Sequence, residues 1–279
     1  MTDTTPAAAR FHVHPEPWIA FRPALDVMLE PLGAAVVSRL HPNVGEHVLD
    51  VGCGCGATTM SLAAIVGPGG KVTGIDTSVA MIDIGRQGAA AAELANVEFV
   101  EGDAGANHFG PRSYDIIFSR LGTMFFDGPE AAFANLRRAL RPGGRLGFVC
   151  WRSVEENAWT AEPRAAASSM VPLPPVPGPE SPGPFSLADP ERISELLSHA
   201  SFVDVTIEPL DEDLLIGRGD IDEAIDFYLR LLPTGYLLFE PDHHLLDRLR
   251  AMLRSVLADH VGDDGLVRLG SASWVVSAH

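Results

Sequence analysis

VLDVGCGCGA, residues 48–57, is an apolar run that ends in an acid and then carries three glycines two residues apart. Two glycine patterns fit it: G-x-G-x-x-G/A from Gly52 to Ala57, and D-x-G-x-G-x-G from Asp50 to Gly56. Either pattern suits a loop whose backbone lies against a bound nucleotide, because a Cβ would clash there. The stretch therefore predicts a strand, a nucleotide-binding loop and a helix, and it leaves the nucleotide undecided.

Strand and helix patterns alternate on both sides of this loop. Short, mostly apolar strands are predicted at residues 47–52, 71–76, 97–103, 114–122 and 145–151. Helices with apolar residues at helical spacing are predicted at residues 24–40, 57–66, 78–95 and 128–140. This alternation is typical of an open parallel sheet.

The rhythm changes after Trp151. Residues 171–185 hold seven prolines and predict an extended surface loop or lid. Around them we expect a helix at 155–170, a helix at 189–201, a strand at 203–210, one or two amphipathic helices within 220–260 and a last strand at 271–279. The predicted fold is Rossmann-like α/β: a seven-stranded, mostly parallel sheet with an antiparallel last strand, helices on both faces and helical cap insertions.

Composition limits the partners. The 279 residues carry 37 acidic against 20 basic side chains, for a formal net charge of −17. Such a surface repels phosphate backbones, so we expect no nucleic-acid partner. The chain begins without a secretion-signal pattern, and no apolar run approaches the ~20 residues of a membrane helix. Three cysteines do not suggest a disulfide framework. We therefore expect a cytoplasmic protein without membrane contact.

Three features favour one nucleotide over the other. Asp50 would repel a pyrophosphate but attract an ammonium group. Asp103 ends the third predicted strand, where a carboxylate can accept from an adenine amino group. The chain ends with strand, helices and strand, which suits an antiparallel final pair. Asp76, at the end of the second predicted strand, suits a ribose in either case. S-adenosylmethionine (SAM) fits these features and NAD fits none of them specifically.

The motifs VLDVGCGCGATT, GID, MI, EGDA and LRPGGRL, in this order, resemble those of class I SAM-dependent methyltransferases. The resemblance covers roughly residues 24–150. Three further stretches resemble the ubiquinone/menaquinone-biosynthesis-type group of small-molecule methyltransferases: YDIIFSRLGTMFF, WRSVEENAW and PGPFSLADPERISELLSHASFVDV. Cys55 departs from the usual residue at its place in the loop but is small enough to be tolerated. No second Cys or His pair accompanies Cys53 and Cys55 at ligand spacing, so we expect no metal.

The resemblance implies the residues that contact SAM, or its product S-adenosylhomocysteine (SAH). Glycines would let the backbone approach, Asp50 would orient the amino acid end, and Asp76 would accept from the ribose. Met81 would cover the adenine, and Asp103 would meet its edge. The full predicted set is Trp18, Asp50, Gly52, Cys53, Gly54, Gly56, Asp76, Thr77, Met81, Asp103, Ala104, Ser119 and Arg120.

The catalytic group is left open. Methyl transfer from a sulfonium needs alignment and exclusion of water, and a general base only for some acceptors. The candidates are His14, His108 and Arg120. We also expect residues 10–22, with Phe11, His14 and Trp18, to fold over the cofactor. The predicted pocket for an apolar or aromatic acceptor is lined by Met124, Phe125, Trp159 and Tyr228.

The predicted organisation has four parts. They are an N-terminal helical lid (1–40), a SAM-binding core (41–153), a proline-rich cap or lid (154–190) and the rest of the core (191–279), with a helical cap at about 218–262. The predicted function is methyl transfer to O, N or C of a small metabolite. The alternatives are a SAM-binding protein without methyl transfer and an NAD(P)-dependent oxidoreductase. An apolar face on residues 220–260 would suit a homodimer or simply the packing of the cap.

Overall fold

The computed structural model describes residues 15–173, 175–178, 180–231 and 243–279. Its sheet has seven strands in the order β3-β2-β1-β4-β5-β7-β6. The strands are β1 (His47–Val51), β2 (Lys71–Asp76), β3 (Val97–Glu101), β4 (Tyr114–Arg120), β5 (Leu140–Trp151), β6 (Thr206–Leu215) and β7 (Arg268–Ala278). Strand β7 runs antiparallel to both β5 and β6, whereas the other pairs are parallel. The predicted fold class is confirmed.

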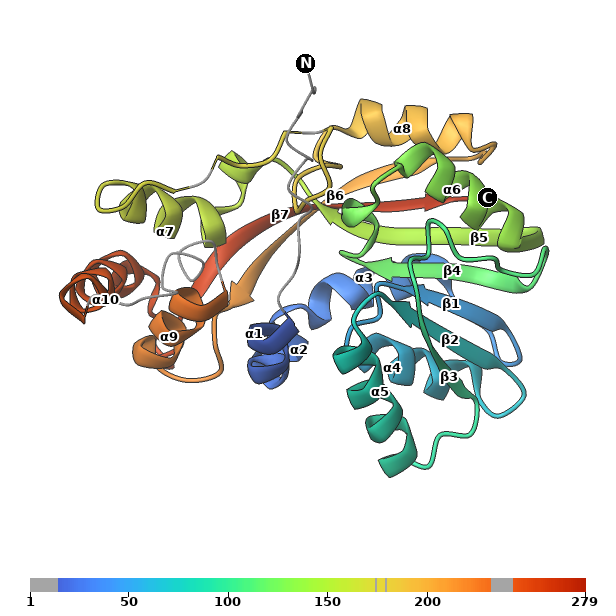
Figure 1. Ribbon diagram of the computed structural model, residues 1–279, viewed down its shortest axis with the longest axis horizontal. Helices are drawn as coiled ribbons and strands as arrows, with labels where there is room; N and C mark the ends of the chain where they lie inside the picture. The colour runs from blue at the N-terminus through green and yellow to red at the C-terminus, as the bar shows by residue number, and fades with distance from the viewer. Residues whose placement is uncertain (1–14, 174, 179, 232–242) are drawn as a thin grey trace, which may run out of the picture.

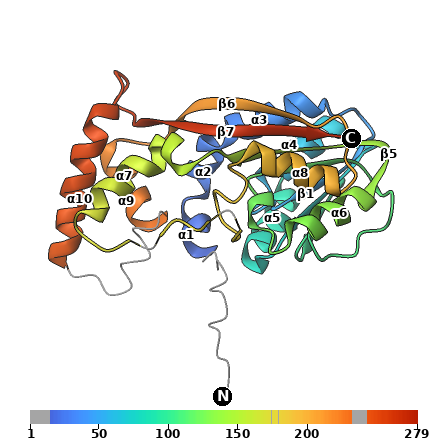
Figure 2. The same ribbon diagram turned by 90° about the horizontal axis from the view of Figure 1, so that it is seen from above.

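Ten α-helices occur in the described residues, and several of them cover the two faces of this sheet. They are α1 (Pro15–Ala20), α2 (Arg22–Met28), α3 (Glu30–Leu40), α4 (Ala57–Val66), α5 (Val79–Ala91), α6 (Pro129–Ala139), α7 (Ala158–Ser168), α8 (Pro190–His199), α9 (Ile221–Leu231) and α10 (His243–Leu257). Helices α6 and α8 pack together on one face, and α3 lies on the other (Figure 2). The central strands are therefore covered on both sides, which is why most residues of β1 and β4 are buried.

Helices α7, α9 and α10 form a separate lobe beyond the sheet, next to the far ends of β6 and β7 (Figure 1). Helices α1 and α2 lie between this lobe and α5, because α1 contacts both α5 and α9. The rings of Phe21 and Phe227 meet edge-on, 5.6 Å apart, and join the N-terminal helices to the lobe. The N-terminal helices thus stand beside the carboxyl ends of the strands.

Several boundaries differ from the predictions, and two of these differences have a clear physical reason. The single helix expected at 24–40 is interrupted at Leu29, which lies between α2 and α3. Pro31 stands in the first turn of α3, where its missing N–H costs nothing; inside a continuous helix its ring would clash with a carbonyl. Strand β5 begins at Leu140, five residues before the predicted start, because Leu140 pairs with Tyr114 across an irregularity in the register.

None of the described helices is long and apolar enough to cross a membrane.

Candidate functional site

The loop after β1 requires glycine at each of its three predicted positions. Gly52, Gly54 and Gly56 have positive φ angles of 70°, 54° and 85°. A Cβ on Gly52 would lie 2.7 Å from the Cα of Gly122, and one on Gly56 would lie 2.5 Å from the ring of Phe99. Side chains essentially never tolerate such approaches, so the path of this backbone is set by the absence of Cβ atoms.

Asp76 holds the loop from the neighbouring strand. Its Oδ2 accepts from the Gly54 amide and its Oδ1 from the Ser78 amide, both at 2.9 Å. Burial raises the pKa of Asp76, against the effect of these amides. Met81 is buried, and its sulfur lies 3.9 Å from where a Cβ on Gly54 would stand. Thr77 is exposed beside it. Each carboxylate oxygen of Asp76 keeps a further lone pair for a ligand hydroxyl.

Asp50 is completely buried at the end of β1 and only half satisfied. Its Oδ2 accepts from the hydroxyls of Thr58 and Thr59, both at 2.7 Å. Its Oδ1 is buried without a hydrogen-bond partner among the described residues. Burial raises the pKa of Asp50, against the two hydroxyls and the positive charge of Arg120. An orphaned carboxylate oxygen is expensive to keep, which makes it a marker of a ligand site.

Arg120, at the end of β4, is the cation that faces Asp50. Its Cδ lies 3.3 Å from where a Cβ on Gly33 would stand, so the side chain runs along α3. Within the part of the chain that the structure describes, its guanidinium makes no hydrogen bond or ion pair within 4.0 Å. Burial lowers the pKa of Arg120, and the charges of Asp50, Asp26 and Glu30 act in the opposite direction. An unpaired cation therefore stands beside an orphaned carboxylate oxygen.

Four residues of this site were not among those predicted from the sequence. Thr58 and Thr59 belong to the quoted motif, but only the fold shows that both hydroxyls point back to Asp50. Arg22 and Asp26 come from α2, and both act electrostatically on the thiol of Cys55, whose pKa is raised chiefly by burial. Helix α2 therefore faces the glycine loop.

The remaining predicted cofactor residues are largely engaged within the protein. The Ser119 hydroxyl donates to the Val51 carbonyl at 2.8 Å and accepts from the Gly122 amide at 3.2 Å, which binds β4 to β1. Asp103 is exposed and accepts from the amide of Gly105. Two further members, Cys53 and Ala104, are buried. Their cofactor contacts stay predictions.

Leu121, which follows Ser119 and Arg120, has a φ of 65°. A bulky residue in the left-handed region is strained, at a cost on the order of 1–2 kcal/mol. This outlier lies next to Gly122, which contacts Gly52 of the glycine loop.

Of the candidate catalytic residues that the structure describes, Arg120 lies in this site and His108 does not. His14 lies outside the described residues, as does Phe11. His108 is exposed, and no hydrogen bond or ion pair joins it to the rest of the site. Arg120 does lie in the site, but a guanidinium stays protonated in proteins, so it acts there as a cation and not as a base. Trp18 is partly buried against the core.

The predicted acceptor residues fall into two groups. Met124 is buried after β4, and Phe125 packs beside it. Trp159 belongs to the lobe and lies 5.0 Å from the ring of Trp151. Tyr228 is fully buried in the same lobe, where its hydroxyl donates to the Trp159 carbonyl at 2.8 Å and burial raises its pKa. Their role in an acceptor pocket stays a prediction.

Among the residues that the structure describes, no three or more His, Cys, Asp or Glu side chains are grouped so as to hold a metal ion.

Comparison with known proteins finds methyltransferases among those that this chain resembles. Residues 48–144 match a protein-family model described as a methyltransferase domain. The chain is 36% identical over 119 residues to aklanonic acid methyltransferase DauC of Streptomyces sp. strain C5, covering 43% of this chain and 54% of that protein. It is 39% identical over 106 residues to demethylmenaquinone methyltransferase of Staphylococcus aureus, covering 38% of this chain and 42% of that protein. The matches thus span about half, or less, of the length of these relatives.

The fold extends beyond those matches. The structure superposes on phosphoethanolamine N-methyltransferase 2 of Haemonchus contortus, solved with phosphomonomethylethanolamine and S-adenosylhomocysteine, with a TM-score of 0.55. The identity is 20%, and the superposition covers 88% of this chain and 51% of that one. Residues 48–144 thus match a methyltransferase-domain model, and the chain shares the fold of this N-methyltransferase.

Proposed function

We propose that this protein binds SAM at the glycine loop and transfers its methyl group to a small-molecule acceptor. The observation that carries the proposal is that two buried groups without partners, Oδ1 of Asp50 and the guanidinium of Arg120, stand near each other. A free amino acid group carries one ammonium and one carboxylate, and it complements this pair of charges. A pyrophosphate has no cation for Asp50, which argues against a dinucleotide.

The other residues of the site fit the rest of the cofactor. The glycine loop offers a backbone surface without Cβ atoms, and Asp76 offers free lone pairs for two ribose hydroxyls. Met81 stands over Gly54, where it can cover an adenine face. We retain Asp103 and Ala104 for the adenine edge. The side chains that would contact the cofactor are mostly carboxylates, which suit a nucleoside with a positive charge.

When bound, SAM supplies an electrophilic methyl carbon on a positively charged sulfur. The chain's own task is then to hold the donor rigidly, to align the acceptor and to exclude water. Asp50 and Arg120 would fix the amino acid end, Asp76 the ribose, and helices α1 and α2 would cover the crevice from the side of Cys55. We assign no general base.

The names of the two relatives support a small-molecule acceptor, because both are methyltransferases named for small metabolites. The net charge of −17 supports an enzyme that avoids nucleic acid. We propose a cytoplasmic location and retain the homodimer as a proposal. The four-part organisation, with 1–40 and 154–190 as lids over a core of 41–153 and 191–279, also stays a proposal.

Titration calorimetry tests the cofactor assignment. The wild-type protein should bind SAM and SAH but not NAD. Asp50→Asn and Arg120→Met should each weaken SAH by about tenfold or more, the usual effect of losing one charge-assisted contact. Their affinity for 5′-methylthioadenosine should stay the same, because this nucleoside lacks the amino acid group. Arg39→Met, which removes an arginine that pairs with Glu208 on the surface, serves as the control.

Equal losses for SAH and methylthioadenosine would contradict the assigned role of the charge pair. Binding of NAD in preference to SAM would contradict the proposed function itself. Transfer of a labelled methyl group from SAM into a metabolite extract then names the acceptor. Tight SAM binding without any transfer would favour the non-methylating alternative.

A further inference from the structure

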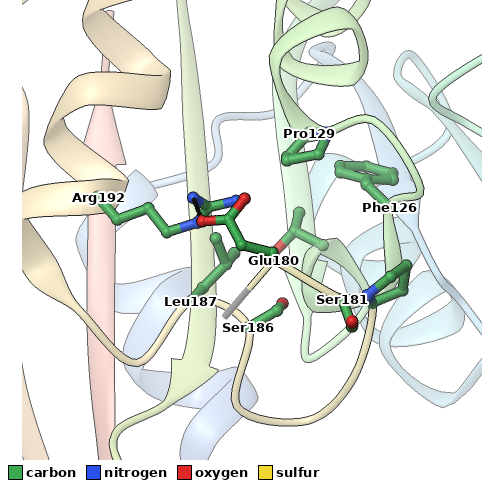
Figure 3. Close-up of a pocket in the computed structure, with 9 residues that line it drawn as sticks. Phe126, Pro129, Glu180, Ser181, Ser186, Leu187 and Arg192 are labelled. Carbon is green, nitrogen blue, oxygen red and sulfur yellow. Dashed lines mark hydrogen bonds and ion pairs between the residues drawn. The ribbon is translucent and has the colours of Figure 1, made fainter. Parts of the chain in front are cut away.

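A pocket lies beside the segment that follows β4 (Figure 3). It is formed where the start of α6, the start of α8 and the proline-rich segment meet. Its lining residues are Thr123, Phe126, Pro129, Glu180, Ser181, Pro182, Ser186, Leu187 and Arg192. None of the residues assigned to the cofactor is among them. We call it the Thr123–Arg192 pocket.

Two polar groups of this pocket lack partners. Thr123 is 1% exposed, and its hydroxyl oxygen is buried without a hydrogen bond among the described residues. The Nε of Arg192 is likewise buried and unpaired. A buried donor that donates to nothing costs about 1–3 kcal/mol, so two in one small pocket point to a missing acceptor.

The eleven-residue helix α6 starts at the same place. Its N-terminal cap is Gly128, which has no side chain to accept from the first amides, and Pro129 follows it into the pocket wall. The amides of the first turn have no partner within the helix, and the helix dipole makes this end positive. Thr123, Arg192 and the start of α6 therefore all favour an anion.

The chain already places one carboxylate there. Oε1 of Glu180 accepts from Nη1 of Arg192 at 3.0 Å, and Figure 3 shows the carboxylate against the guanidinium. The Glu180 side chain is 83% exposed, whereas that of Arg192 is 21% exposed. Glu180 thus covers Arg192 from the solvent side through a single contact and leaves Nε unused. A carboxylate inside the pocket can take Nε together with an Nη atom, which is the stronger, bidentate arrangement.

The pocket is connected to the segment where we expect the acceptor. Thr123 directly follows Gly122, which contacts Gly52 of the glycine loop. On the other wall, the Ser186 hydroxyl and the Gly183 amide donate to the Met124 carbonyl at 2.6 and 3.0 Å. A molecule that reached from Met124 into this pocket would therefore lie between the cofactor loop and the proline-rich segment.

We propose that the Thr123–Arg192 pocket binds a carboxylate of the methyl acceptor, and that Glu180 occupies Arg192 until the acceptor displaces it. That the bound molecule is the methyl acceptor rests on the proposed function, whereas the carboxylate site itself does not. The substrate class is thus an acidic small molecule whose carboxylate is bound away from the reacting atom. Glu180 adds selectivity, because a neutral molecule gains nothing from displacing it.

Benzoate and its neutral analogue benzamide are the probes, with binding measured by titration calorimetry or ligand-observed NMR. Glu180→Gln removes the competing carboxylate and should tighten benzoate by about fivefold, whereas Arg192→Gln should weaken it by about tenfold or more. Glu195→Gln is the matched control: it removes one charge from an exposed position of the same helix. Benzamide should bind weakly and equally to all four proteins. Inorganic phosphate and acetate are added as competitors at concentrations that carry the same total anionic charge. Phosphate should displace benzoate less well than acetate does.

Thr123→Val separates a ligand role from a structural one. The substitution removes an unpaired buried hydroxyl without changing the shape of the side chain, so the free energy of unfolding should not fall. Benzoate affinity should nevertheless drop, by about threefold to tenfold. A merely structural Thr123 would produce the opposite combination.

Equal binding of benzoate and benzamide, or equal effects of Glu180→Gln and Glu195→Gln, would overturn the proposal. So would the absence of benzoate binding to Glu180→Gln. The SAH affinity of every variant is measured in parallel and should stay within about twofold of wild type. If the wild type fails to bind SAH while the benzoate pattern holds, the proposed function falls and the anion site stands.

Discussion

Two regions meet at the carboxyl edge of the sheet, and they are held in different ways. The glycine loop is held by the adjacent strand β2: the amides of Gly52 and Cys53 both donate to the Ile75 carbonyl, at 2.9 and 3.1 Å, and the Gly54 amide donates to Asp76. In the cap, which we define as residues 154–190 together with the α7–α9–α10 lobe, side chains reach across the fold. Asn157 joins Ala272 in this way, by two hydrogen bonds across 115 positions of sequence.

The difference has a consequence for function. A loop built from neighbouring strands and glycine φ angles is rigid before any ligand arrives, which suits a cofactor shared by many enzymes. A cap tied down by single side chains can change its lining without changing the sheet, which suits a variable acceptor. Substitutions in the glycine loop should therefore disturb cofactor binding, whereas substitutions in the cap should leave cofactor binding largely unchanged.

Gly52→Ala should have the largest effect. It places a Cβ 2.7 Å from the Cα of Gly122 at a φ of 70°, so both strain and a backbone clash follow. We expect the free energy of unfolding to fall by about 2–5 kcal/mol and SAH binding to be lost. Thermal unfolding and calorimetry measure the two effects.

Gly178→Ala in the cap is the matched control. Nothing lies within 4 Å of the added Cβ, and no positive φ is needed there. Its stability should stay within about 0.5 kcal/mol of wild type, and its SAH affinity should be unchanged. If both variants lose SAH binding equally, the contrast between a rigid loop and an adaptable cap is wrong.

Elements with local sequence signals are predicted accurately, whereas features that depend on distant contacts are not. Helix α4 and strand β2 begin and end where the pattern predicts, at 57–66 and 71–76, because apolar spacing and flanking glycines are local signals. Strand β5 escaped prediction at its start, since the pairing of Leu140 with Tyr114 depends on a distant strand. The meeting of α1, α5 and α9 has no local signal at all.

Asn157→Ala should have the second largest effect, and on the cap alone. Asn157 is fully buried, and its Oδ1 accepts from the Ala272 amide and the Trp159 indole, both at 2.9 Å. Its removal leaves these donors unsatisfied, at about 2–4 kcal/mol in total. The melting temperature should fall by roughly 5–12 °C, while SAH affinity changes less than about threefold.

Asn43→Ala is the surface control for that variant. Asn43 is exposed, and its amide side chain donates only to the nearby carbonyl of His41. Its effect should stay within about 0.5–1 kcal/mol. A loss of SAH binding in Asn157→Ala as large as the loss in Gly52→Ala would show that the cap and the loop form one cooperative unit.

The site divides in the same way between local and distant signals. Asp50, Asp76 and the three glycines stand in strand–loop–helix patterns, so residue type and spacing suffice to single them out as candidates. The unpaired state of Arg120 could not be predicted, because it depends on where α2 and α3 place Asp26, Glu30 and Gly33. Thr123 and Arg192 are 69 positions apart in sequence and only the packing of α6 on α8 brings them to one pocket.

Asp50→Asn should have the smallest effect on the free energy of unfolding. The difference between this variant and wild type should change with pH. Burial raises the pKa of Asp50 above its ordinary value of 3.8, so the folded protein holds this proton more tightly than the unfolded chain. That contribution is complete below pH 3.8 and is lost as pH rises through the raised pKa. The variant, whose amide can still accept from Thr58 and Thr59, should therefore gain on wild type as pH rises, by on the order of 1–2 kcal/mol.

Asp264→Asn, at the turn before β7, should behave in the opposite way. The Arg268 guanidinium and the Leu266 amide lower the pKa of the exposed Asp264 to about 2. Its stabilising contribution is therefore present above pH 3.8 and is lost as pH falls toward 2, so this variant should lose on wild type at neutral pH. Urea unfolding of the three proteins between pH 2 and 7 measures both differences. The same sign for both variants would mean that Asp50 is paired in solution, and the orphaned oxygen on which the SAM proposal depends would not exist.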